Sequence, residues 1–202
     1  MHKWLLVTIA LATLAGCASD GRALSPPQDW QTTTTRPPPP TSAPDNEVSV
    51  TGLALTSPDF VPGAAAPVDT TCAGQNVFPT LVWEGLPEAT TEIAVSLSDQ
   101  TDPEEPLLLW LMAGINPNET GLIGGQLPDG AYETLNDFGN LGYGTPCLEG
   151  LGEGSHDLQF RIHILEQPSG LAGGDAGNEA WASLQAQATD SASLLMRIES
   201  AP

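Results

Sequence analysis

The sequence predicts a mainly β domain, a two-sheet β-sandwich with a few short and mostly C-terminal helices. Segments of alternating apolar and polar residues recur along the chain, separated by turns rich in glycine and proline. The 202 residues include 21 glycines and 19 prolines but few aromatics, which is more typical of a loop-rich β protein than of a helical bundle. Only two segments, both near the C-terminus, have apolar residues at helical spacing.

Five segments are predicted to form strands. One of them alternates, with Ile93, Val95 and Leu97 on one side, and another is a continuous apolar run that suits the centre of a sheet. Turn residues such as Pro62-Gly63 and Asp129-Gly130 separate the strands. In chain order the predicted strands cover residues 48–57, 79–87, 91–99, 106–115 and 156–165.

Two helices are predicted after the last strand. Residues 178–188 place Trp181, Leu184 and Ala188 on one helical face. Residues 190–200 follow, with Asp190 in a position to cap the first turn.

The last predicted strand contains both histidines that lie beyond the first residues of the chain. His156 falls on the apolar side of this strand together with Leu158 and Phe160. Two interpretations are open: His156 is part of a binding pocket, or it is a core histidine whose ring is satisfied by a neighbour. His163 falls on the opposite, polar side and is predicted to be a surface residue.

The charge of the chain excludes one class of partner. It has 25 acidic residues against 5 basic residues, a formal net charge of -20. Such a surface repels phosphate backbones, so no nucleic-acid binding is expected. Docking onto anionic lipid through a basic patch is not expected either, for the same reason.

The N-terminus is predicted to be a lipoprotein signal peptide, residues 1–16. Its apolar run, Trp4 to Leu14, is too short to span a bilayer and suits the core of an export signal. The run ends in Leu14-Ala15-Gly16-Cys17, which resembles the bacterial lipobox. We therefore expect Cys17 to be lipidated and the protein to be exported and anchored to a bacterial membrane in the cell envelope.

The residues that follow are predicted to be a tether. Residues 17–46 comprise the lipidated cysteine and a disordered stretch rich in threonine and proline, without apolar periodicity. The folded domain is predicted to comprise residues 47–202.

Four motifs stand out in this domain: Cys72-x-Gly74-x-Asn76-x-x-Pro79, Trp83-x-Gly85-x-Pro87, Asn136-Asp137-Phe138-Gly139 and Gly142-Tyr143-Gly144-x-Pro146-Cys147. Together they resemble the phosphatidylethanolamine-binding protein (PEBP) family, in particular its bacterial YbhB/YbcL, Raf kinase inhibitor-like branch. The resemblance covers about residues 48–167 and implies a β-sandwich with a small anion-binding pocket at one end, where members bind phosphate-bearing head groups. Some members inhibit kinases or serine proteases.

The resemblance also implies which residues form the pocket, and the sequence departs from the family pattern at several of them. The family's Asp-Pro-Asp-x-Pro segment keeps its first aspartate, but Thr101 replaces the second. Leucines replace the histidine that precedes Trp110 and the tyrosine of the His-Arg-Tyr motif, whose arginine becomes Asp157. The pocket is predicted to consist of Asp99, Pro103, Leu109, Gly144, Pro146, His156 and Leu158.

These replacements predict a partly degenerate anion pocket. Each lost charge-assisted hydrogen bond costs about 1.5–3 kcal/mol of binding. Two such losses weaken phosphate binding by roughly several hundred-fold. Leu109 and Leu158 would make the wall apolar, so the ligand is expected to be a small anionic molecule held weakly or an apolar one. Asp99 and His156 could also form a satisfied pair with no ligand.

Two further cysteines, Cys72 and Cys147, are predicted to form a disulfide because the chain is exported. The bond would close a loop of roughly 75 residues and contribute on the order of 4 kcal/mol. The alternatives are that the two cysteines are free thiols or that they form part of a metal site. No metal and no cofactor are expected, since the acidic run Asp102 to Glu105 lacks calcium-loop spacing.

The predicted function is that of an exported binding protein for a small ligand or an envelope protein. The alternative is an inhibitor-type module that binds a protease or kinase and no small ligand. An enzyme is not expected, since neither Gly-x-Ser-x-Gly nor His-Glu-x-x-His occurs. A hydrolase built on His156 and Asp99 is the less favoured third class.

Overall fold

The computed structural model describes residues 52–144, 151 and 154–199. The predicted signal peptide, the tether and Cys17 lie outside the described residues, as do Pro146 and Cys147. Within the described part of the chain, no helix is long and apolar enough to cross a membrane.

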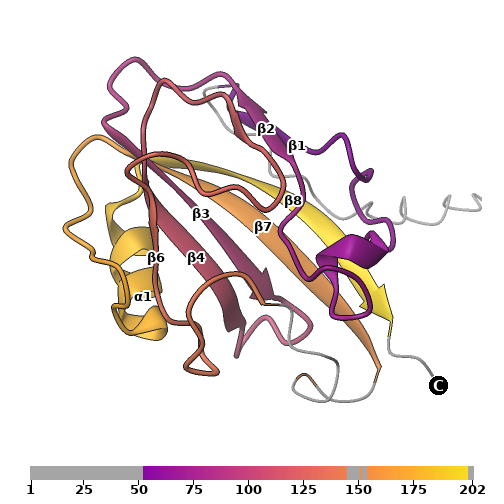
Figure 1. Ribbon diagram of the computed structural model, residues 1–202. Helices are drawn as coiled ribbons and strands as arrows, with labels where there is room; N and C mark the ends of the chain where they lie inside the picture. The colour runs from indigo at the N-terminus through magenta and orange to yellow at the C-terminus, as the bar shows by residue number, and fades with distance from the viewer. Residues whose placement is uncertain (1–51, 145–150, 152–153, 200–202) are drawn as a thin grey trace, which may run out of the picture. The chain divides into compact units, whose positions relative to one another are not determined.

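The strands form two antiparallel sheets, as predicted for a sandwich (Figure 1). Sheet A has three short strands in the order β1-β2-β5, and sheet B has five in the order β6-β4-β3-β7-β8. Sheet A contains β1 (Ala54–Thr56), β2 (Leu81–Glu84) and β5 (Gly121–Leu122). Sheet B contains β6 (Tyr132–Glu133), β4 (Leu107–Ile115), β3 (Glu92–Asp99), β7 (Ser155–Leu165) and β8 (Asp190–Glu199).

Each face of sheet B packs against a different layer. The main core fills the space on the side of sheet A, with residues such as Trp83, Trp110 and Phe160 fully or almost fully buried. The other face packs in part against helix α1 (Gly177–Gln187), whose Ala180 and Leu184 contact a smaller apolar cluster. A single turn of 3-10 helix, η1 (Val68–Thr70), precedes β2.

A β-bulge in β4 sets the geometry of one end of the main core. In the ladder between β3 and β4, Leu97 pairs with Trp110 and Ser98 pairs with Leu108, which leaves Leu109 as an extra residue. As a result both Leu109 and Trp110 pack in the main core, although they are consecutive.

The second predicted helix is wrong: residues 190–199 form the edge strand β8. The apolar residues of this segment recur at every second position, and Ala192, Leu194, Met196 and Ile198 all pack in the main core. Period-two burial suits a strand, and pairing with β7 from Ser155 to Ile164 outweighs the local helical preference of the segment. Each of the five predicted strands overlaps a strand of the structure, although β1 and β2 are shorter than predicted, and the helix predicted over residues 178–188 corresponds to α1. Residues 48–51 are not described.

The structure shows why the motif Trp83-x-Gly85-x-Pro87 has a glycine at position 85. Its φ is +78°, in the left-handed region. A Cβ atom at this position would lie 2.3 Å from the carbonyl oxygen of Gly52, so the two backbones can approach only because no side chain intervenes.

We therefore expect Gly85→Ala to lower the free energy of unfolding by about 3 kcal/mol. Roughly 1–2 kcal/mol comes from the left-handed backbone and the rest from the clash. Gly139→Ala is the matched control, because Gly139 has a φ of +74° but nothing within 4 Å of the added Cβ. Urea unfolding of both variants isolates the contribution of the close approach. Equal losses in the two variants would contradict this explanation.

Candidate functional site

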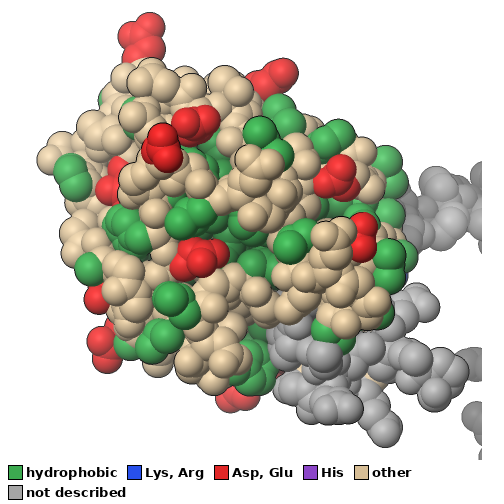
Figure 2. Space-filling view, viewed as in Figure 1, with side chains coloured by type: hydrophobic (Ala, Val, Ile, Leu, Met, Phe, Trp, Pro, Cys, Tyr) green, Lys and Arg blue, Asp and Glu red, His purple; other side chains and the backbone are tan. Residues whose placement is uncertain are grey.

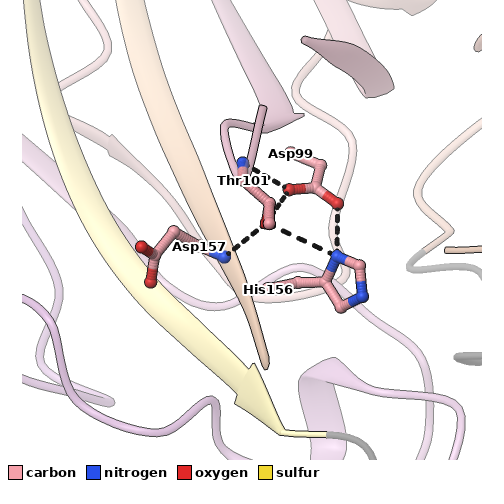
Figure 3. Close-up of polar contacts among 4 residues, drawn as sticks. All are labelled: Asp99, Thr101, His156 and Asp157. Atoms are coloured by element: carbon pink, nitrogen blue, oxygen red, sulfur yellow. Dashed lines mark hydrogen bonds and ion pairs between the residues drawn. The ribbon is translucent and has the colours of Figure 1, made fainter. Parts of the chain in front are cut away.

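Asp99 and His156 form a buried pair at the end of sheet B (Figure 3). Asp99 ends β3 and lies opposite Leu158 of β7, two residues from His156 on the same face of the sheet. The His156 Nδ1 and Asp99 Oδ2 atoms are 2.7 Å apart. Only 6% of His156 and 5% of Asp99 is exposed. The structure therefore brings together the two polar residues retained from the family's pocket pattern.

Thr101 holds the second oxygen of the same carboxylate. Its backbone N–H and its hydroxyl both donate to Asp99 Oδ1, over 2.8 and 2.5 Å. The hydroxyl oxygen in turn accepts a hydrogen bond from the backbone N–H of Asp157 at 3.0 Å. Thr101 thus links the turn after β3 to the start of β7 and fixes the orientation of Asp99 (Figure 3).

The other ring nitrogen of His156, Nε2, is buried and has no hydrogen-bond partner among the described residues. A buried polar atom without a partner costs about 1–3 kcal/mol, so such atoms are uncommon in folded proteins. This atom is the feature that distinguishes the pair from a fully satisfied core histidine.

The surroundings of His156 on this face are apolar. Leu158 on its own strand and Ile198 directly opposite on β8 are both buried. Leu109 and Leu158, which stand in place of the family's histidine and tyrosine, are completely buried in the main core. Of the other predicted pocket residues, Gly144 is half-buried, Pro103 is exposed in the turn before β4, and Pro146 is not described.

Both cationic side chains of the described residues lie away from His156. Alternation along β7 places Arg161 and Asp157 on the opposite face of sheet B. Arg197, paired across the ladder with Asp157, donates to its carboxylate over 2.8 Å on that same face. On the face of the domain shown in Figure 2, acidic side chains surround a group of hydrophobic ones, and no lysine or arginine of the described chain is seen.

An aromatic cluster lies at one end of the main core. Phe78 stacks on Trp110 with a centroid separation of 4.8 Å, and Tyr143 and Phe160 contact the same indole edge-on. The Tyr143 hydroxyl donates to the carbonyl of Thr70, and burial raises the pKa of this phenol. A hollow of about 360 Å³ adjoins the cluster, but neither Asp99 nor His156 lines it; its lining includes Pro67, Thr70, Phe78 and Pro79.

The bond between Tyr143 and Thr70 also bears on the predicted disulfide. It brings the loop that precedes Cys147 next to the loop that contains Cys72. Cys72 is exposed, whereas Cys147 is not described, so the disulfide stays a prediction. Within the described ranges, no three histidine, cysteine, aspartate or glutamate side chains gather closely enough to hold a metal ion.

The prediction that His163 lies on the surface is wrong. Its side chain is 1% exposed, and Nε2 lies 2.9 Å from the hydroxyl of Ser96. The polar-looking face of β7 is covered here, and His163 and Arg161 line a hollow together with Gln185 near the end of α1. Burial, with a smaller contribution from the Arg161 charge, lowers the pKa of His163 from 6.5 to about 3.

This lowered pKa predicts a loss of stability in acid. Between pH 6.5 and about 3 the unfolded chain binds a proton at His163 that the folded chain does not. The free energy of unfolding therefore falls as the pH falls, by up to about 1.4 kcal/mol per pH unit. In His163→Gln, whose amide can still bond Ser96, we expect a smaller loss between pH 7 and 5. Urea unfolding at both pH values measures the difference, and parallel curves for the two proteins would refute it.

Comparison with known proteins shows the family of this chain. The model of the family described as "Phosphatidylethanolamine-binding protein" matches residues 56–199. The chain is 30% identical, over 98% of both sequences, to "Putative lipoprotein LppC" of Mycobacterium tuberculosis. The chain belongs to the phosphatidylethanolamine-binding protein family. It is also 33% identical to the UPF0098 protein Rv1910c of the same organism, over 71% of this chain and 68% of that one.

Solved structures of PEBP proteins share the fold. The crystal structure of Escherichia coli YbcL covers 74% of this chain and 99% of its own, with a TM-score of 0.67 and 25% identity. A PEBP homologue from Chlamydia trachomatis has a TM-score of 0.64 over 74% of this chain and 98% of its own, at 20% identity. The expected two-sheet PEBP sandwich is therefore confirmed.

Sequence reasoning missed the part that Thr101 plays in this PEBP domain. It treated Thr101 only as the loss of a family acid, whereas the structure shows it donating twice to Asp99. The spacing Asp-x-Thr is a signal that could have indicated this contact. An aspartate commonly accepts a hydrogen bond from the backbone two residues on, which forms an Asx turn.

Proposed function

We propose that this chain is an exported, lipid-anchored PEBP protein of the cell envelope that binds a small ligand at His156. Export and anchoring are supported by the lipobox-like sequence that ends in Cys17. They are supported further by a relative named as a lipoprotein, to which the chain is 30% identical over 98% of its length.

The observation that carries the ligand proposal is the buried and unpartnered Nε2 of His156. Asp99 and Thr101 satisfy and orient the rest of this polar group, so only one atom is left to bind something else. The neighbouring leucines add apolar surface, which suits a ligand with an apolar body and one polar group. We propose in addition that the site binds and does not catalyse. The Thr101 hydroxyl lies 3.4 Å from Nδ1, the nitrogen that already bonds Asp99, so it is not aligned with a base as a nucleophile would be.

A thermal-shift screen of the chain from Ala18 to Pro202 tests the ligand proposal. A small molecule at about 100 times its dissociation constant is expected to stabilise the protein by about 2.7 kcal/mol. The shift should disappear in His156→Gln and persist in His163→Gln, which changes the histidine on the other face of sheet B. Hits that stabilise the His156→Gln variant equally would place binding elsewhere and refute the proposal.

A second candidate function is the binding of an envelope protein, such as a protease. It is favoured by exposed apolar side chains near the same end of sheet B, where Leu107 is 38% and Phe138 is 40% exposed. Phe138→Ser should then weaken cross-linking to the partner in cells while leaving the thermal shift with small ligands unchanged. Unchanged cross-linking would exclude Phe138 as a contact.

A further inference from the structure

The structure points to the class of ligand. We infer that the His156 site takes a head group that donates a hydrogen bond and carries no negative charge, such as an alcohol or an amine. The inference rests on the proposed function, because it assumes that this site binds a ligand. It follows from the proton on the ring, from the charges around the ring, and from the contacts of Thr101.

The first step concerns the proton on His156. The carboxylate of Asp99 can only accept hydrogen bonds, so the Nδ1 atom that lies 2.7 Å from it must carry a proton. In the neutral ring the proton is then on Nδ1, and Nε2 has a lone pair. The one unpartnered atom of the site is therefore an acceptor, and it is matched by an O–H or N–H of the ligand.

The second step concerns charge. The binding of an anion at Nε2 itself would require that nitrogen to take up a second proton, and a cation beside it would favour such binding. Both described cations, Arg161 and Arg197, lie on the opposite face of sheet B, and Arg197 is bonded to Asp157. The whole chain carries a formal net charge of -20, which repels anions and attracts amines. The neighbours of His156 on its own face, Leu158 and Ile198, supply no donor from their side chains.

The third step assigns Thr101 as a positioning residue. Its two donors occupy Asp99 Oδ1, which leaves Oδ2 directed at the His156 ring. Where the family pattern has a second acid, a hydroxyl therefore helps to hold Asp99 Oδ2 against Nδ1, which in the neutral ring favours the tautomer with its proton on Nδ1. Removing that hydroxyl should allow the proton to move between the two ring nitrogens.

Nitrogen-15 NMR of the histidine rings tests the inference on residues 18–202, a chain that keeps every described residue. His156 and His163 are its only histidines, so His163 serves as an internal reference. The ligand-free spectrum should show His156 protonated at Nδ1 and bare at Nε2. In Thr101→Val the Nε2-protonated form should increase, whereas Thr71→Val, which removes an exposed hydroxyl from another loop, should leave the ring unchanged.

Four probes with the same phenyl body then compare head groups: benzyl alcohol, benzylamine, benzoate and phenyl phosphate. The alcohol or the amine should shift His156 Nε2 saturably and at least about tenfold more tightly than either anion, a difference of about 1.4 kcal/mol. Tighter binding of benzoate or phenyl phosphate, with Nε2 becoming protonated, would overturn the inference but support the proposed function. No shift of His156 with any of the four probes would count against both. An Nε2-protonated ring in the ligand-free protein would overturn the inference alone.

Discussion

Replacing Trp110 with alanine is expected to lower the free energy of unfolding by about 3–5 kcal/mol. Trp110 is completely buried and contacts Phe78, Tyr143 and Phe160, so its removal leaves a large cavity where three aromatic rings meet. Its Nε1–H also donates to Glu133 Oε1 over 2.7 Å, and that half-buried carboxylate would lose a partner. For a domain of this size the loss corresponds to a fall in Tm of roughly 10 °C.

Two variants separate the contributions to this loss. Trp110→Phe keeps a ring against Phe78 but removes the bond to Glu133, and it should cost about 1–3 kcal/mol. Trp181→Ala removes a half-buried tryptophan from α1 and should cost less than Trp110→Ala. Thermal and urea unfolding measure all three variants. A loss in Trp110→Ala no larger than that in Trp181→Ala would contradict the central place of Trp110 in the core.

Replacing Asp99 with alanine is expected to destabilise the protein by about 2–4 kcal/mol and to abolish binding at His156. The variant leaves three donors without their acceptor: the N–H and hydroxyl of Thr101 and the buried Nδ1 of His156. Each buried donor left unpaired costs about 1–3 kcal/mol, whereas the donors of exposed Thr101 can turn to water. Without the carboxylate, only the Thr101 hydroxyl, 3.4 Å away, remains within reach of Nδ1, so the ring loses the contact that orients it and its Nε2 atom.

Asp157→Ala provides the matched control for this prediction. Asp157 lies in the same part of the sheet, but its ion pair with Arg197 is about half exposed, with 52% and 49% of the two side chains accessible. Exposed pairs contribute about 0–1 kcal/mol. Urea unfolding should therefore show a small change for Asp157→Ala and a large one for Asp99→Ala. Similar losses in both would mean that the buried pair has no special role.

The strands could be predicted because their patterns are local. In β3, Ile93, Val95 and Leu97 alternate, and β4 is an apolar run buried on both faces, so the sequence alone indicates the sheet and its centre. The segment 190–199 misled because Leu194 and Leu195 permit both a helical and an alternating pattern. Only the ladder with β7, which is a long-range contact, decides between the two.

The candidate site could be predicted only in part from the sequence. Family spacing identified Asp99 and His156, and the structure places them in contact. The burial of His163 could not be predicted, because it depends on where α1 and the following turn pack against the far face of sheet B. The bulge at Leu109 was equally hidden, since it arises from a register shift between two strands and not from any residue type.

Native mass spectrometry of the protein purified from the cells that make it most directly tests the claim that the His156 site holds a ligand. We predict a bound small molecule in the wild type, in addition to any covalent lipid, and its loss in His156→Leu, which removes the ring but keeps an apolar side chain. The same adduct in both proteins, or none in either, would contradict the claim.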